Sequence, residues 1–502
     1  MSQHSMRSSV ATRLTLGLGS SLANQILGAI QMFALTPFFM TAWGVEVYGK
    51  WVVISSIISY LNLADFGGQT YIANALAIHF ARDNRDAFKR TLGEAVSLFL
   101  FLGVSLFGAV VFAVVLFMHV NLPGLGRPLV PWEAQTLTLL AASFLLLSFP
   151  GGVYVTAYRA TGNYTRGTTA YNSARLFTLS ICLGILLLGG APREFAAGQL
   201  LATFLSQMGI VYDLRRSIPL SREISIGFHA AKTARRHLTG AIPFWLIAIA
   251  QAIGQQGMVI VLAMVASPAI VALYATHRSM SAVSGYIGPT LQAPLLPEFS
   301  FLYSQERSRA LRNLTLLAIE SNVLLTGVIA IFIWWAAPLI YPLWTNYRLH
   351  LNPVLLALIL LQGVVASIWS ATSWPLLAAN RHRLVAAFMT LSSVAALCGT
   401  YLIVKAVGVL GVPVAALIAD LLFVVPVTPI LAARFLSVPV IQIFASMGKS
   451  IAFVALLASV SVVVNLPLPS HRVIPLLVVS ITAAIYILGK VKAHLRSATM
   501  LT

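Results

Sequence analysis

The chain has 502 residues, of which 59% are hydrophobic and only 9% charged, and its mean hydropathy is +0.88. Soluble domains carry about 25% charged residues, so the composition excludes an ordinary soluble protein and indicates a polytopic membrane protein. The formal net charge is +19. The cations lie in short loops between apolar runs and form no separate basic module, which argues against nucleic acid as a partner.

Apolar runs of about 20 residues, the length that crosses a bilayer, follow one another along the whole chain. The first, from Leu14, is too long for a signal-peptide core and has no small-residue cleavage site after it. We count about fourteen runs, centred near residues 28, 60, 105, 145, 178, 203, 253, 285, 325, 363, 393, 420, 457 and 480. Cys182 and Cys398 both lie inside such runs, so we expect neither a disulfide framework nor a metal cluster.

Lys and Arg alternate between the loops. Both termini and every second loop together hold 24 of the 32 cations, whereas the other loops hold 6. Because Lys and Arg concentrate on the cytoplasmic side of a membrane, both termini are predicted to be cytoplasmic. That orientation requires an even number of spans, which agrees with fourteen.

Three pairs of segments indicate an internal duplication. LANQILGAIQ at 22–31 aligns with IAQAIGQQGM at 249–258, so that Gln25 falls on Gln251, and DNRDAFKR at 83–90 aligns with ERSRALR at 306–312. RATGNYTRG at 159–167 resembles LAANRHRLV at 377–385, and the interval between the copies changes only slowly along the chain. Six spans separate the copies, so the halves run parallel, and transporters of this design bind substrate between their halves.

The predicted domains follow from this duplication. They are a six-helix lobe (1–213), a basic cytoplasmic linker (214–237), a second six-helix lobe (238–436), and two additional helices with a cytoplasmic tail (437–502).

Two helix breaks are expected at matching places in the halves. The run from Tyr48 to His79 is too long for one straight span, and Gly67 and Gly68 each lower helix propensity by about 1 kcal/mol. Gly288 and Pro289 occupy a similar place in the second half, where proline removes a backbone hydrogen bond. These breaks are either hinges for lobe movement or bends that fit a helix to its neighbours.

Ionisable side chains within spans are costly and usually face a cavity or a partner. Arg175 is the first candidate, because Thr168, Tyr171, Asn172 and Thr178 recur with it at helical spacing. The planar guanidinium of arginine suits a diphosphate, which it can bind bidentately. The alternative is a structural ion pair with Asp65 or Asp420. The same two interpretations apply to Arg278.

Amides line the first and seventh spans. Asn24 and Gln25 lie in the first, and Gln251 and Gln255 in the seventh. Amides both donate and accept hydrogen bonds, which suits sugar hydroxyls, and they also bond well between helices.

Three acids lie within spans: Asp65, Glu320 and Asp420. They either carry H⁺ or Na⁺ in a coupled cycle or neutralise the arginines when substrate is absent. The ten histidines show no metal-ligand spacing. We expect no cofactor and no metal site.

Two stretches resemble the polysaccharide-flippase branch of the multidrug/oligosaccharidyl-lipid/polysaccharide (MOP) exporter superfamily, which includes O-antigen (Wzx-type) flippases, the lipid II flippase and, more distantly, MATE exporters. They are YGKWVVISSIISYLNLADFGGQTYIANALAIHFARDNRDAFKRTL and LYATHRSMSAVSGYIGPTLQAPLLPEFSFLYSQERSRALRNL. The resemblance implies an all-α membrane protein of about 14 transmembrane helices. Two pseudo-symmetric six-helix lobes would surround a central cavity, two C-terminal helices would be added, and the lobes would rock to give alternating access.

By this resemblance, the chain is a transporter in the bacterial cytoplasmic (inner) membrane rather than an enzyme. It would flip a polyprenyl-diphosphate-linked oligosaccharide, the repeat unit of a surface polysaccharide such as lipopolysaccharide or exopolysaccharide, to the outer leaflet. Its partners would be this lipid-linked substrate, membrane lipids and polysaccharide polymerase or assembly proteins.

Two alternatives stay open. A MATE-like drug/cation antiporter is the first, although the first and seventh spans carry amides where such antiporters place a carboxylate. A membrane-embedded glycan polymerase or glycosyltransferase is the second. Such enzymes usually carry a large extracytoplasmic loop or a soluble nucleotide-sugar domain, whereas the longest outer loop here, around 119–131, holds no carboxylate pair for acid–base catalysis.

Overall fold

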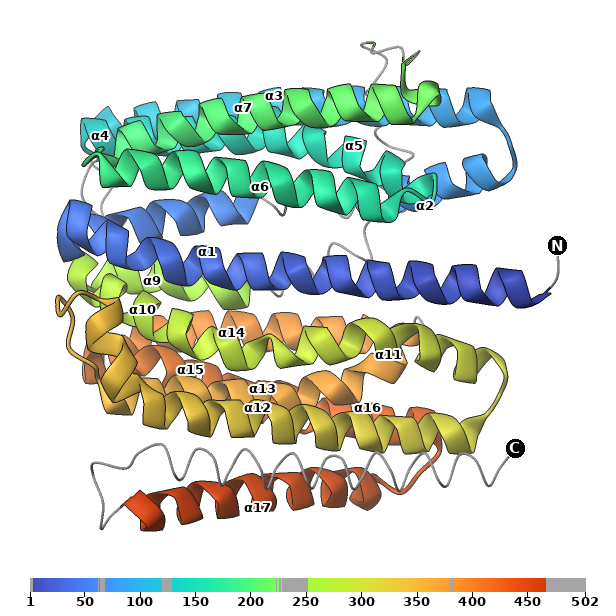
Figure 1. Ribbon diagram of the computed structural model, residues 1–502. Coiled ribbons are helices and arrows are strands. Elements are labelled where there is room, and N and C mark those ends of the chain that lie inside the picture. Colours follow the sequence, from blue (N-terminus) through green and yellow to red (C-terminus); the bar gives the residue numbers. More distant parts are fainter. Residues whose placement is uncertain are drawn as a thin grey trace. The chain divides into compact units, whose positions relative to one another are not determined.

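The computed structural model describes residues 3–61, 63, 68–119, 129–222, 224, 227, 252–379, 381 and 383–465, with the backbone alone for most of 3–32, for 461–465 and at a few other positions. The chain divides into two compact units, Met1–Leu273 and Tyr274–Thr502. All regular structure in the described residues is helical (Figure 1).

Long helices make up unit 1, and several are nearly continuous with the next. They are α1 (Gln3–Tyr60), α2 (Gly68–Ala81), α3 (Arg85–His119), α4 (Pro131–Ala142), α5 (Phe149–Ala160), α6 (Tyr164–Leu187), α7 (Pro192–Ser217) and α9 (Met258–Val265). A π-helical turn, η2 (Ser143–Ser148), joins α4 to α5, and another, η4 (Ile253–Gly257), precedes α9.

Unit 2 begins within α10 (Pro268–Gly285). Its other helices are α11 (Ile287–Ser304), α12 (Ser308–Trp344), α13 (Pro353–Ala378), α14 (Arg383–Val407), α15 (Gly411–Ala419), α16 (Val427–Leu436) and α17 (Val440–Asn465). The π-helical turn η6 (Asp420–Val424) joins α15 to α16.

Eight helices in the described part of the chain are long and apolar enough to cross a membrane. One of them, Arg383–Leu436, is 54 residues long, about 80 Å at 1.5 Å per residue, and turns at Gly408, whose φ is 66°. It therefore makes two passes. α1 likewise consists of two helical segments joined at Gly44, which has φ 74° and ψ 175°. The predicted all-α polytopic class is confirmed, while the span centred near residue 480 lies outside the described residues.

The turns before α3 and α12 have similar backbone geometry. α3 begins at Arg85 and α12 at Ser308. The turns before them contain the left-handed residues Asp83 (φ 50°) and Glu306 (φ 54°), each two positions before the start of its helix. These residues begin the two segments aligned from the sequence as DNRDAFKR and ERSRALR. The basic linker expected at 214–237 lies mostly outside the described residues, so the lobe boundaries stay a prediction.

Two helix breaks lie close to the glycines that the sequence singles out. α1 ends at Tyr60 and α2 begins at Gly68, whereas Gly67 and Asp65 lie outside the described residues. In the second copy α10 ends at Gly285 and α11 begins at Ile287, so Gly288 and Pro289 lie in its first turn. Whether these breaks act as hinges stays a prediction.

Aromatic rings fix the turn of α1 at Gly44. Trp43 and Trp51 lie on either side of that turn, with ring centroids 5.2 Å apart, and both contact Phe195 at the start of α7 at 5.7 and 5.0 Å. The Trp43 indole also donates a hydrogen bond to the Gly190 carbonyl at 2.8 Å. This end of unit 1 is therefore tightly packed around the point where α1 reverses.

Candidate functional site

The predicted polar stripe on α6 lies against α1. Arg175 is half-buried, and a Cβ on Gly28 of α1 would stand 3.2 Å from its Nη2 and 3.6 Å from its Nη1. The missing side chain at Gly28 therefore makes room for the guanidinium. The arginine that the sequence singled out thus lies beside a glycine of the first helix.

Asn172, one turn before Arg175 on the same helix, has a buried carbonyl oxygen. Its Oδ1 has no hydrogen-bond partner among the described residues. A buried polar atom without a partner costs about 1–3 kcal/mol, so such an atom points to a ligand or ordered water. The Thr178 hydroxyl instead bonds to the Ala174 carbonyl of its own helix at 3.0 Å.

A pocket of about 390 Å³ adjoins the first turns of α6. Its walls come from α2, α5 and α6, and its polar members are Gln69, Thr156, Tyr158, Arg159, Thr168 and Tyr171. Two residues of the predicted stripe, Thr168 and Tyr171, therefore line a cavity. The polar groups of the lining are an amide, hydroxyls, phenols and one guanidinium, set in a largely apolar wall.

Two adjacent glycines in α5 shape the wall of this pocket. A Cβ on Gly152 would collide with Oε1 of Gln69, and a Cβ on Gly151 would collide with Oε1 of Gln207. The Gln69 amide donates to the Phe149 carbonyl at 3.4 Å, whereas Gln207 Oε1 is buried without a partner among the described residues. Only glycine at both positions lets the amides of α2 and α7 approach the α5 backbone so closely.

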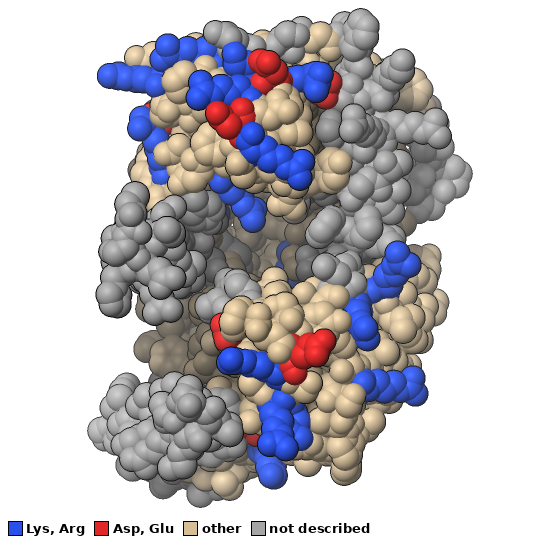
Figure 2. All heavy atoms as spheres, turned by 90° about the vertical axis from the view of Figure 1, so that its right-hand side faces the viewer, with Lys and Arg blue, Asp and Glu red and all other residues tan. Residues whose placement is uncertain are grey.

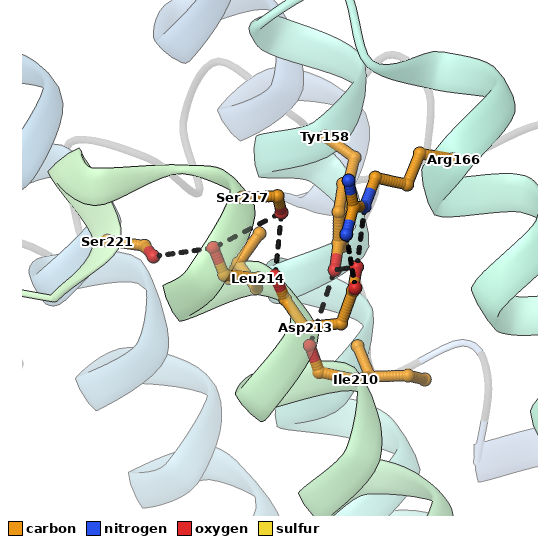
Figure 3. A network of polar contacts seen from close by, with 7 residues as sticks. All are labelled: Tyr158, Arg166, Ile210, Asp213, Leu214, Ser217 and Ser221. Atoms are coloured by element: carbon orange, nitrogen blue, oxygen red, sulfur yellow. Dashed lines mark hydrogen bonds and ion pairs between the residues drawn. The ribbon is translucent and has the colours of Figure 1, made fainter.

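A polar cross-tie joins Tyr158 of the pocket wall to α6 and α7 (Figure 3). Arg166 binds Asp213 bidentately, with Nε 3.0 Å from Oδ2 and Nη2 2.7 Å from Oδ1. The Tyr158 hydroxyl donates to Asp213 Oδ2 at 2.6 Å. We name these three residues the α5–α7 cross-tie. It fixes Tyr158, a wall of the pocket, and the start of α6.

Sequence reasoning misses the cross-tie. The sequence pattern places Arg166 in a basic loop and does not single out Asp213. The available signal is the acid Asp213, which is separated by one leucine from the pair Arg215 and Arg216 in VYDLRRS. An isolated acid in an otherwise basic segment indicates a specific partner.

The other predicted arginine lies in unit 2. The guanidinium carbon of Arg278 stands 5.9 Å from the ring centroid of Tyr274, one turn earlier on α10. Its neighbour His277 is fully buried; its Nε2 accepts from the Asn352 backbone N–H at 3.0 Å, and its Nδ1 lies 3.2 Å from the Tyr341 hydroxyl. His277 is thus a packed structural residue.

Each predicted acid of unit 2 has a serine partner. Glu320 Oε1 accepts from Ser446 of α17 at 3.0 Å, so it contacts one of the two additional helices. Asp420 Oδ1, in η6, accepts from Ser392 of α14 at 2.8 Å. Their role in ion coupling stays a prediction.

Four other predicted site residues add little to this geometry. Gln255 lies exposed in η4. The side chains of Asn24 and Gln25, and the whole of Gln251, lie outside the described residues.

This fold is that of a polytopic, all-α membrane protein. Neither a protein-family model nor a curated protein sequence matches the chain. Among solved structures, it is similar to the lipid II flippase MurJ in an inward closed conformation, with a TM-score of 0.66 and 12% identity over 97% of this chain and 100% of that one. It is also similar to a multidrug resistance MATE family transporter of the MOP superfamily in an inward-facing conformation, with a TM-score of 0.63 and 16% identity over 85% of this chain and 97% of that one. At these identities the likeness establishes the fold alone.

Proposed function

We propose that this protein is a flippase that carries a polyprenyl-diphosphate-linked oligosaccharide, the repeat unit of a surface polysaccharide, from the cytoplasmic to the outer leaflet by alternating access. One observation carries the proposal: the half-buried guanidinium of Arg175 lies one turn from the unpartnered Asn172 Oδ1. A cation that can bind two oxygens suits a diphosphate. The neutral polar pocket nearby offers hydrogen bonds to sugar hydroxyls.

The orientation of the protein is part of this proposal. Figure 2 shows the side that lies at the right in Figure 1, where Lys and Arg gather on each unit with fewer acids among them. In unit 1 the turn between α2 and α3, which carries Arg82 and Arg85, lies at this end. We assign the basic end of each unit to the cytoplasm because cations concentrate there. We assign both termini to the cytoplasm for the same reason. The pocket beside Arg159 then opens near the leaflet in which a lipid-linked precursor is made.

Drug/cation antiport is the second candidate, since the MATE transporters share the fold. The chemistry at the described end of the seventh span favours the flippase, because η4 there carries Gln255 and no acid. The energy source for flipping is proposed to be an H⁺ or Na⁺ gradient. Collapsing each gradient separately in cells would identify which one drives the cycle.

The first test is deletion of the gene in its native host, followed by analysis of polyprenyl-linked glycans in the cytoplasmic membrane. We expect an unpolymerised lipid-linked repeat unit to accumulate and surface polysaccharide to be lost. Wild-type protein should restore both and Arg175→Ala should not. Arg175→Lys, which keeps the charge but not the planar fork, should restore them partly.

Leu391→Ala is the matched control, because Leu391 is exposed on α14 of unit 2. It should rescue fully. Unchanged lipid intermediates, combined with new sensitivity to cationic dyes, would overturn the flippase and support the antiporter. If the deletion causes accumulation and Arg175→Ala restores transport as well as wild type does, the flippase proposal stands. Arg175 is then not part of the substrate site.

A further inference from the structure

A second cavity lies on the other side of α6. It is a groove of about 470 Å³ between α6 and α7, which we name the α6–α7 groove. Its lining is mostly apolar and includes Ala170, Ala174, Phe177, Leu205, Gly209 and Asp213. The proposed transport site does not use it.

Small residues open this groove. A Cβ on Gly209 would have no heavy atom within 4 Å, so the space beside it is open. The Ser206 hydroxyl donates to the Ala174 carbonyl at 3.4 Å and so joins the two helices. Leu176 and Met208, on the two flanking helices, are 44% and 57% exposed. Large apolar side chains left so open on a membrane-spanning helix face the hydrocarbon of lipids.

The groove has nearly the length of a leaflet. From Ala170 to Phe177 the helix rises about 10 Å, and from Leu205 to Asp213 about 12 Å. One leaflet contributes about 15 Å to the hydrocarbon core. An acyl chain lying in the groove would therefore be covered along most of its depth in that leaflet.

The polar end of the groove is cationic. Asp213 is the acid there, and Arg166 neutralises it through the bidentate contact of the cross-tie (Figure 3). Arg216 also lies within electrostatic reach of Asp213, and Arg215 is exposed beside it. The four side chains carry a net charge of about +2, at the level of the lipid headgroups, where an anionic phosphate is attracted.

We propose that the α6–α7 groove binds an anionic phospholipid of the leaflet at the basic end of unit 1, with one acyl chain in the groove and its phosphate beside Arg215 and Arg216. The occupant is a bulk membrane lipid and not the transported substrate. The reason is the position of the cross-tie: Tyr158 lines the polar pocket and Asp213 lines the groove, and their hydrogen bond separates the two cavities. A substrate with its head in the pocket and its chain in the groove would have to pass around or break this bond.

The test uses the full-length protein in vesicles that contain a trace of phosphatidylglycerol with a photoreactive acyl chain. After illumination, the labelled peptides are mapped by mass spectrometry. We expect labelling of the peptides that contain Ala170–Phe177 and Leu205–Asp213. A matched phosphatidylcholine probe should label them at least about fivefold less.

Gly209→Leu fills the groove without displacing a neighbour at its Cβ and should sharply reduce the labelling. Gly184→Leu on α6 also meets no atom within 4 Å of its Cβ, but lies outside the groove and should leave labelling unchanged. Arg216→Gln should lower the preference for phosphatidylglycerol over phosphatidylcholine. Binding of any of these variants to the transported substrate is not expected to change.

Several outcomes would overturn the proposal. Equal labelling by both probes would mean that the groove takes hydrocarbon regardless of the headgroup. Undiminished labelling in Gly209→Leu would place the lipid elsewhere. Displacement of the probe by added polyprenyl diphosphate would assign the groove to the substrate chain, and cross-links between two copies of the protein would assign it to a dimer interface.

Discussion

On α6 of unit 1, Asn172 and Arg175 form a polar face beside Gly28 of α1. α6 begins at Tyr164 and α14 of unit 2 begins at Arg383. When the two helices are aligned at these first residues, Asn172 and Arg175 fall on Leu391 and Val394, both exposed and apolar. In the sequence alignment of 159–167 with 377–385 they fall instead on Thr390 and Ser393, so in either register α14 has no amide or arginine where α6 has Asn172 and Arg175.

Between α3 and α12 the polar residue lies in unit 2 and the apolar residue in unit 1. Phe99 in the core of unit 1 contacts Phe149 with ring centroids 4.7 Å apart. When α3 and α12 are aligned at their first residues, Phe99 falls on Asn322, which is fully buried in unit 2. The Asn322 Nδ2 donates to the Ser367 carbonyl at 2.7 Å, and its Oδ1 has no partner among the described residues. At these matched positions the two units therefore differ in where they place polar groups, so we expect substitutions there to affect the two units differently.

The largest effect is expected from exchanging these core residues. Phe99→Asn should destabilise unit 1 by about 3–5 kcal/mol, because it leaves a cavity and buries an amide with no partner. Asn322→Leu should cost less than about 1 kcal/mol, because the unpartnered Oδ1 disappears together with the donated bonds. Denaturant titration followed by tryptophan fluorescence would measure both. Equal losses would mean that Asn322 is as closely fitted to its site as Phe99 is.

The next effect concerns Gly28. Gly28→Leu requires the guanidinium of Arg175 to move, because even a Cβ would stand 3.2 Å from Nη2. We expect transport to fall between about 10- and 100-fold, the factor that follows from losing charge-assisted hydrogen bonds worth about 1.5–3 kcal/mol. The double variant Gly28→Leu/Arg175→Ala should be no worse than either single variant.

Gly108→Leu on α3 provides the control, since no heavy atom lies within 4 Å of its Cβ. It should transport normally. Wild-type transport by Gly28→Leu, or additive losses in the double variant, would show that Arg175 acts independently of its position over α1. Val394→Ala in unit 2 is expected to change nothing.

Substitution of Asn172 should reduce transport without changing stability. Asn172→Ala removes a buried oxygen that has no partner among the described residues, so the free energy of unfolding should change by less than about 0.5 kcal/mol. Transport should fall between about 2- and 10-fold, as expected for one lost neutral hydrogen bond to substrate. A variant that unfolds easily and transports normally would reverse this assignment and make Asn172 structural.

The sequence predicts the helices better than the site, for a physical reason. Span number depends on apolar runs, which are local, and the matched turns at Asp83 and Glu306 can be predicted because each copy repeats its own short segment. Arg175 stands out because its polar neighbours recur on one helix. The contact between the Arg175 guanidinium and Gly28 depends on how α1 and α6 pack. No local sequence pattern encodes that packing.

The same limit applies to pairs across helices. Gln69 of α2 lies against Gly152 of α5, and Glu320 of α12 bonds to Ser446 of α17, so both pairs join helices that are distant in the chain. In the sequence, Glu320 is a candidate for coupling simply because it is an acid within a span. Its contact with α17 cannot be derived from composition or spacing.

The smallest expected effect is a difference in thermal stability between arginine variants at the basic ends of the two units. In unit 1 the start of α6 is tied to α7 by Arg166 and Asp213; in unit 2 Arg381, before α14, lies over the ring of Phe435 in α16, 5.5 Å from its centroid. Arg166→Gln should lower the unfolding midpoint by about 2 °C at low salt, and less in about 0.5 M salt, because the Arg166 side chain is 51% exposed and salt screens it.

Arg381→Gln should lower the midpoint by at most about 1 °C, since an exposed cation–π contact contributes less than a bidentate ion pair with a hydrogen-bonded acceptor. Differential scanning fluorimetry of both variants at two salt concentrations makes the comparison. If the two shifts are equal at low salt, the cross-tie of unit 1 adds no more stability than the aromatic contact of unit 2. Its presence would then be explained by its second role, as the wall that keeps the polar pocket and the α6–α7 groove apart.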